Sequence, residues 1–368
     1  MENIKKIIIA SLATFFLLSI ILGGCAAPER VEKVEQPSEE EAVIPIVEEE
    51  EEEEEAISKK EITGNINILS GHQISDDIND SRPIAIMVEN SPDSRPQSSL
   101  NLADVVIEIV DEGGVTRFIA VYSSHEAEVL GPVRSARQYY AEVAAGFDPI
   151  YTFWGTYPEG YEIIESMGLD VLSVLGDPTG ASSIIARASH WRDETRSAPH
   201  NGYMSTLQLK EDAEDLGFSL DGGKSPFKFK LEAPPSERGE IDEIGVDFSY
   251  QQFRADYRYD SENNNYLKYI AGNPHMDRET DTQIEANNVV VMLTDIVESG
   301  NEAGHMIVRT TNGGSAFFFM DGNIIEGTWN RTSVSDPFEF EDQQGNPILF
   351  NRGTTWISMI ESIDNLIY

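Results

Sequence analysis

Two residues in the first half of the chain have the side chains that acid–base chemistry needs. His200 lies in the string Ala-Pro-His-Asn, in a loop that Pro199 stiffens, and the chain holds only six histidines. A neutral imidazole beside a carboxylate can act as a general base or a general acid. Glu112, in the turn Asp-Glu-Gly-Gly, is the natural partner of His200 or an alternative acid. Glu112 and His200 are therefore the candidate catalytic residues, and the competing interpretation is a histidine that only hydrogen-bonds its loop.

Several arginines lie beside predicted strand ends or Pro/Gly turns. Arg134 and Arg137 are three residues apart, so at the start of a helix they would point to one side. With the backbone amides after Gly131-Pro132 they could hold a carboxylate or a phosphate. The alternative is internal ion pairing with nearby acidic residues. The candidate ligand-binding residues are Arg95, Arg117, Arg134, Arg137, Asn201 and Trp154, whose ring could stack on a sugar or simply fill a core.

Other common kinds of site find no support in the sequence. The only cysteine is Cys25, which excludes an intrachain disulfide and any site built from several thiolates. No Gly-x-Ser-x-Gly or His-Glu-x-x-His string is present. His275 and Asp277 would share a strand face, but no third metal ligand accompanies them. We therefore expect neither a cofactor nor a metal.

The elements that must position these residues change in character along the chain. Apolar runs at 83–88, 105–110, 115–122 and 150–154 predict strands, and helical spacing predicts helices at 138–147, 161–167 and 206–216. This mixture indicates an α+β or α/β N-terminal domain over 81–221. A segment rich in Gly, Pro, Ser and charge follows at 222–240. Beyond it, short strands separated by turn signals predict a β-rich C-terminal domain over 241–365.

The N-terminus predicts the cellular location. Residues 1–24 contain the pair Lys5-Lys6 and then an apolar run over 7–22. This run is shorter than a membrane-spanning helix, which needs about 20 residues. The run ends in Leu-Gly-Gly-Cys, which resembles the bacterial lipobox. We expect cleavage before Cys25 and attachment of lipid, with acyl chains such as palmitate, to its sulfur. The protein would then be anchored to the cell membrane on its extracytoplasmic face.

A highly acidic segment follows the lipobox. Residues 25–68 include an unbroken glutamate run from Glu48 to Glu55, and the whole chain has a net charge of −39. Such a segment repels itself and buries little surface, so it predicts a disordered tether. Binding of calcium or of a basic partner by the glutamate run is the less favoured alternative, and the alternating oxygen ligands of a dedicated calcium site are missing. The charge also argues against nucleic-acid binding, which needs clustered cations.

Long strings in both predicted domains resemble the YerB-like family of bacterial lipoproteins, with DUF3048 N- and C-terminal domains of unknown function. The strings are Arg82–Asn90, Arg95–Gln97, Ala103–Val106, Glu112–Phe118, Gly131–Arg137, Ala198–Asn201, His275, Asp277, Thr280, Ala286–Val291, Glu326–Trp329 and Thr355–Ile357. The resemblance implies a lipid-anchored protein of the cell envelope with a link to cell-wall synthesis or turnover.

Three functions stay open at this point. The leading expectation is a binding or accessory module that recognises an anionic cell-wall component, such as peptidoglycan or a teichoic acid, or a wall-synthesis protein. The second is an enzyme that cleaves wall glycan or peptide, with Glu112 and His200 as its acid–base pair. The third is a purely structural surface protein, which is favoured if the arginines and acidic residues pair with one another.

Overall fold

The computed structural model describes residues 60–74, 82–180 and 185–368. The predicted signal segment 1–24, the lipidation site Cys25 and most of the predicted tether lie outside the described residues. Within the described ranges, no helix is both long and apolar enough to cross a membrane.

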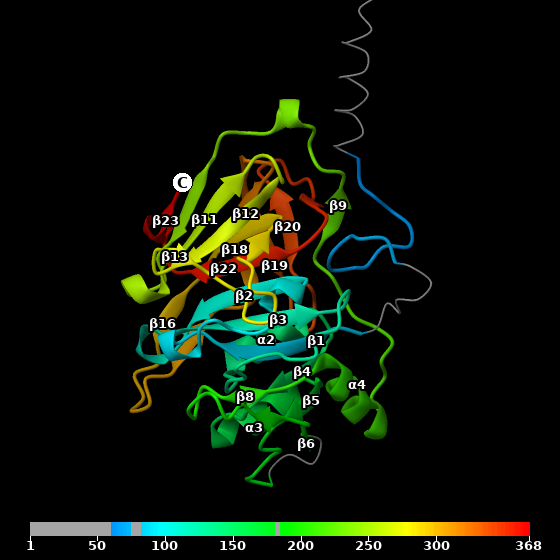
Figure 1. The fold of residues 1–368 in the computed structure, drawn as a ribbon, viewed down its shortest axis with the longest axis vertical. Coiled ribbons are helices and arrows are strands. Elements are labelled where there is room, and N and C mark those ends of the chain that lie inside the picture. The colour runs from blue at the N-terminus through cyan, green and yellow to red at the C-terminus, as the bar shows by residue number, and fades with distance from the viewer. Residues whose placement is uncertain (1–59, 75–81, 181–184) are drawn as a thin grey trace, which may run out of the picture. The chain divides into compact units, whose positions relative to one another are not determined.

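An eleven-stranded sheet runs through both predicted domains (Figure 1). The strand order is β20-β19-β18-β15-β22-β2-β3-β1-β4-β5-β6. Strand β2 lies parallel to β22, with Val105 opposite Thr355. The bounds are β1 Ile84–Glu89, β2 Val105–Val110, β3 Thr116–Tyr122, β4 Ile150–Phe153, β5 Asp170–Ser173, β6 Ala186–Arg187, β15 Asn288–Leu293, β18 Asn312–Met320, β19 Asn323–Arg331, β20 Glu339–Asp342 and β22 Thr355–Ile360. The sheet thus contains strands from both sides of the predicted boundary segment 222–240. The division into two domains stays a prediction.

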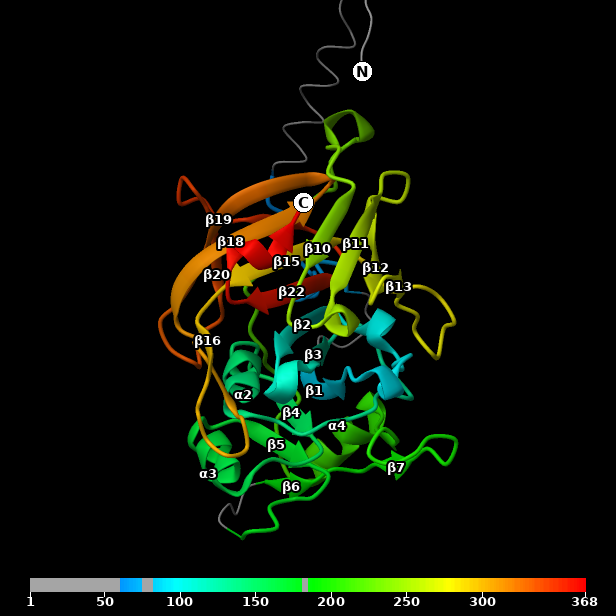
Figure 2. The ribbon, with the colours of Figure 1, turned by 90° about the vertical axis from the view of Figure 1, so that its left-hand side faces the viewer.

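Both faces of this sheet are covered, which is why its strands read as nearly continuous apolar runs. Successive side chains of a strand point to opposite faces. Ile107 packs on the face covered by α2 (Gln138–Ala145) and α3 (Pro158–Ser166). Val106 packs on the opposite face, covered by α4 (Thr206–Asp215) and by a second, smaller sheet (Figure 2).

The smaller sheet has six strands from the second half of the chain, paired antiparallel. They are β10 Glu243–Val246, β11 Ala255–Asp260, β12 Asn265–Ile270, β13 Asn273–Pro274, β14 Glu285–Ala286 and β23 Leu366–Ile367. The remaining strands of the described residues form three two-stranded sheets. These are β7 Trp191–Arg192 with β8 Gly202–Tyr203, β9 Lys228–Lys230 with β21 Leu349–Asn351, and β16 Ile296–Glu298 with β17 Met306–Val308. Short 3-10 helices lie at Pro92–Ser94, Leu100–Leu102, Glu112–Gly114, Pro235–Glu237, Gln251–Phe253 and Ile363–Asn365.

The fold is therefore mixed, with few helices and many strands, as the sequence predicts at that coarse level. The structure differs from the prediction where the tether was expected to reach residue 68. Ile62 pairs with Phe229, and Leu69 is fully buried. Ile66 and Ile68 pack against the same core. The cause is local composition, because after the glutamate run the apolar residues of 62–69 bury enough surface to join the fold.

Candidate functional site

One edge of the main sheet collects most of the polar residues of interest. Strands β1, β4, β5 and β6 run parallel, so their carboxyl ends meet at this edge. Glu89 ends β1, Trp154 directly follows β4, and Arg187 ends β6. Open sheets with parallel strands commonly bind ligands outside these ends. We call this region the carboxyl edge.

Three chain segments lie side by side across the carboxyl edge. The Val133 amide donates to the Gly202 carbonyl at 2.8 Å, and the Trp154 amide donates to the Arg134 carbonyl at 3.0 Å. Gly202 permits the close approach, because a Cβ there would lie 2.1 Å from the Trp154 ring. Of the predicted site residues, the structure thus brings Arg134, Trp154, His200 and Asn201 together.

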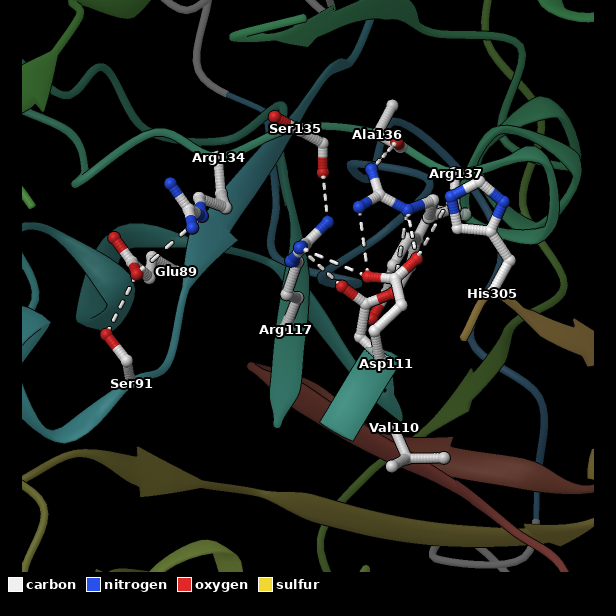
Figure 3. A network of polar contacts seen from close by, with 12 residues as sticks. Glu89, Ser91, Val110, Asp111, Arg117, Arg134, Ser135, Ala136, Arg137 and His305 are labelled. Carbon is white, nitrogen blue, oxygen red and sulfur yellow. Dashed lines mark hydrogen bonds and ion pairs between the residues drawn. The ribbon is translucent and has the colours of Figure 1, made fainter. Parts of the chain in front are cut away.

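His200 is held by Glu89, where the sequence suggested Glu112. Its Nδ1 lies 3.0 Å from Glu89 Oε1, which also accepts from Ser91 Oγ at 2.8 Å. Arg134 Nε is 3.7 Å from the same oxygen (Figure 3). A carboxylate only accepts hydrogen bonds, so Nδ1 is the nitrogen that carries the hydrogen, and in the neutral imidazole Nε2 then keeps its lone pair. Glu89 Oε2 is buried and has no hydrogen-bond partner among the described residues.

Glu112 belongs to a neighbouring ion-pair cluster. Arg137 binds both of its carboxylate oxygens, and Arg137 Nη2 lies 2.9 Å from Oε2. Arg117 Nη2 lies 2.5 Å from Asp111 Oδ2, and Arg117 Nη1 donates to the Ser135 carbonyl at 2.7 Å. In Figure 3, Arg117 lies between Arg137 and the Glu89–Arg134 pair. Arg117 and Arg137 therefore pair internally, which was the alternative to ligand binding.

The electrostatics of this cluster disfavour Glu112 as a proton donor. Burial alone would raise the pKa of Glu112, but hydrogen bonds from Arg137 and Asp111 and the charges of both arginines lower it to about 2. Burial raises the pKa of Asp111, against the opposing charge of Arg117. At neutral pH Glu112 is thus a carboxylate engaged with Arg137.

Arg95 and Asn201, two other predicted site residues, hold neighbouring loops in place. Arg95 donates to Asn90 Oδ1 at 3.1 Å and to the Gln252 carbonyl at 2.9 Å, and it lies over the Phe253 ring. Burial lowers the pKa of Arg95 to about 10. Asn201 accepts from Arg192 Nη1 at 2.6 Å. Arg95 thus ties the loop after β1 to the second half of the chain, and Asn201 fixes Arg192.

Arg192 is an exposed cation of the carboxyl edge that was not among the residues predicted from the sequence. The Arg192 guanidinium lies 4.5 Å from the centre of the Trp154 ring, and His190 meets the same ring edge-on. Arg192 is exposed, and within the described residues no carboxylate lies within ion-pair distance of it. The available signal was three arginines between residues 187 and 196, in a chain with few cations.

The Glu112–Arg137 pair predicts acid sensitivity. A carboxyl group whose pKa is lower in the folded state stabilises the fold above its ordinary value, here 4.5, and that contribution is lost as the pH falls towards 2. The stability advantage of the native protein over Glu112→Gln should therefore shrink between pH 5 and pH 2. Urea unfolding at each pH measures it, with Glu262→Gln as the exposed control. A constant advantage across this window would contradict the pairing.

Comparisons with known proteins agree with this fold. The family described as "Protein of unknown function (DUF3048) N-terminal domain" matches residues 69–219, and the corresponding C-terminal domain matches 244–357. "Putative lipoprotein YerB" of Bacillus subtilis (strain 168) is 31% identical over 308 residues, covering 80% of this chain and 86% of the relative. The crystal structure of the Bacillus subtilis YerB protein matches with a TM-score of 0.70 and 28% identity, covering 82% of this chain and 98% of that chain. The chain therefore belongs to the YerB family, which carries DUF3048 N- and C-terminal domains.

Proposed function

We propose that this protein is a lipid-anchored module of the extracytoplasmic face that binds an anionic component of the cell wall at the carboxyl edge. The anchor is the lipidated Cys25, in keeping with the name of the Bacillus relative. The observation that carries the binding proposal is Arg192, an exposed cation stacked on Trp154 without a carboxylate partner among the described residues.

The surroundings of Arg192 suit an anionic polymer. Its guanidinium can form paired hydrogen bonds to a carboxylate or a phosphate, and Trp154 holds it in place. Arg134 adds a second, partly exposed cation beside Glu89. The large negative charge elsewhere on the chain acts weakly here, because physiological salt screens exposed charges beyond about 8 Å. A local cationic surface can thus bind anions on an acidic protein.

A sedimentation assay tests this proposal. The full-length chain, purified in detergent, is mixed with purified cell wall before and after removal of the phosphate polymers. We expect the native protein to pellet and Arg192→Gln to bind at least about tenfold more weakly, since a charge-assisted bond contributes about 1.5–3 kcal/mol. Arg258→Gln is a matched control, because Arg258 is also exposed and lies 4.2 Å from the Tyr269 ring centre.

The outcomes separate the candidate ligands. Binding that is lost with the phosphate polymers identifies them as the ligand, whereas unchanged binding identifies carboxylates of the peptide. Native-like binding by Arg192→Gln, or no binding at all, would overturn the proposal. In the latter case a wall-synthesis protein becomes the partner to test.

A further inference from the structure

The carboxyl edge also contains the parts of an acid–base site that binding alone does not require. Ser91 Oγ, His200 Nδ1 and Arg134 Nε all lie within 3.7 Å of one oxygen, Glu89 Oε1. The Glu89 side chain is 4% exposed, and its second oxygen has no hydrogen-bond partner among the described residues. A buried carboxylate needs an explanation, and fixing the His200 imidazole through Oε1 supplies one.

The arrangement leaves the reactive nitrogen of His200 available. The Glu89 carboxylate holds Nδ1, so in the neutral imidazole Nε2 is the nitrogen that can accept a proton. Nε2 makes no hydrogen bond to any described residue, and the side chain is 21% exposed. A base so oriented can take a proton from a water molecule. Ser91 is placed to support Glu89, because its Oγ lies on the Nδ1 side, 3.3 Å from that nitrogen.

Two arginines are linked to His200 through its neighbours: Arg192 through Asn201, and Arg134 through Glu89. Asn201, the next residue, holds Arg192 at 2.6 Å. Arg192 stacks on Trp154, whose amide bonds the backbone of Arg134. Arg134 in turn lies beside the carboxylate that holds His200. These contacts form a closed ring that contains both arginines and His200.

We propose that the carboxyl edge hydrolyses a phosphodiester, with His200 as the general base and Glu89 as its positioning residue. This inference rests on the proposed anion binding. A phosphodiester is both anionic and hydrolysable. A free carboxylate offers no leaving group, and a neutral carboxyl ester would leave Arg192 without a charge partner among the described residues. The phosphodiester therefore fits the cations and the base together.

The step balances without a further reactant. His200 Nε2 removes a proton from water as the water oxygen bonds to phosphorus. The bond from phosphorus to the leaving oxygen breaks on the opposite side, that oxygen takes a proton from solvent water, and His200 releases its proton to solvent. The products are a phosphate monoester and an alcohol. Glu89 stays ionised and stabilises the transient imidazolium, and Arg134 and Arg192 stabilise charge on the phosphoryl oxygens.

The test follows conversion of a diester to a monoester by ³¹P NMR. The full-length chain in detergent is incubated with glycerophosphodiester oligomers in the presence of EDTA. We expect conversion by the native protein, and a loss of about 10²–10⁴-fold with His200→Gln while binding is retained. Glu89→Gln should lower kcat and change the pH profile, whereas Arg192→Gln should raise KM and lower kcat with the pH profile unchanged. His125→Gln, an exposed histidine outside this site, is the control.

The outcomes distinguish this inference from the proposed function. Binding without conversion overturns the hydrolysis and leaves the binding module intact. No binding of the oligomer by the native protein overturns the choice of a phosphodiester, and the sedimentation assay then decides whether the anion site itself stands. Conversion that survives His200→Gln, or that EDTA abolishes, overturns the role assigned to His200. Circular dichroism melting of each variant separates a catalytic loss from unfolding.

Discussion

Replacing Lys268 with methionine should destabilise the fold by about 3–5 kcal/mol, because it leaves a buried charge without its partner. Lys268 Nζ lies 3.3 Å from Glu108 Oε2, and both side chains are 0% exposed. The other Glu108 oxygen accepts from Thr116 Oγ1 at 2.7 Å and from Asn90 at 3.0 Å. Burial lowers the pKa of Lys268, although Glu108 opposes that shift.

A double variant identifies the cause of this loss. Glu108→Leu combined with Lys268→Met removes both charges, and we expect it to be more stable than Lys268→Met alone. Urea unfolding of the three proteins measures the difference. Glu243→Gln, which removes an exposed carboxylate 3.7 Å from Arg258, should change stability by less than about 1 kcal/mol. A Lys268→Met variant as stable as the native protein would show that Glu108 is not held as a buried ion.

The position of this pair explains its importance. Glu108 lies on β2 and Lys268 on β12, so the pair joins the main sheet to the smaller sheet. Lys268 also lies 4.5 Å from the Trp356 ring centre. A second contact nearby joins Gln97 to the buried His275 at 2.8 Å. The two regions that match the family domains are thus connected by buried polar contacts as well as by strands.

Truncating Phe350 to alanine should cost about 3–5 kcal/mol, through lost burial and an internal cavity. Phe350 is fully buried on β21, and its ring lies 5.0 Å from that of Phe227 and 5.8 Å from that of Phe340. Strand β21 pairs with β9, to which Ile62 also pairs. We therefore expect the loss to loosen the attachment of residues 60–74.

Two measurements test the Phe350 prediction. Urea unfolding gives the stability, and amide hydrogen exchange reports whether Ile62 loses protection before the main sheet does. Tyr250→Ala is the control, because this aromatic side chain is largely exposed and its removal leaves no buried cavity. A Phe350→Ala protein with unchanged stability would mean that the site collapses without loss of packing.

The sequence predicted the local elements better than their assembly. The runs at 83–88 and 105–110 correspond to β1 and β2, because strands buried on both faces are apolar throughout. The pairing of β2 with β22 joins residues about 250 positions apart, and no local pattern specifies such a partner. The helix expected at 161–167 begins earlier, at Pro158, because proline fits the first turn of a helix.

The candidate site was partly predictable for the same reason. His200, Trp154 and Arg134 were chosen for their chemistry, and the structure brings them together. Glu89 was passed over as the partner of His200, because the two residues are 111 positions apart and meet only through the loops over β1. Arg117 and Arg137 were expected either to bind ligand or to pair internally, and the structure shows that they pair. The sequence could not decide this, since pairing depends on distances across the sheet edge.

The central claim, that anionic groups bind at the carboxyl edge, is tested most directly by the indole signals of the four tryptophans. A ¹H–¹⁵N NMR titration of the full-length chain with glycerophosphodiester oligomers follows all four, and Trp154→Phe assigns the key signal. We expect the Trp154 signal to shift with saturation and those of the buried Trp329 and Trp356 to stay unchanged. A Trp154 signal that does not move, while the oligomer binds elsewhere, would contradict the account.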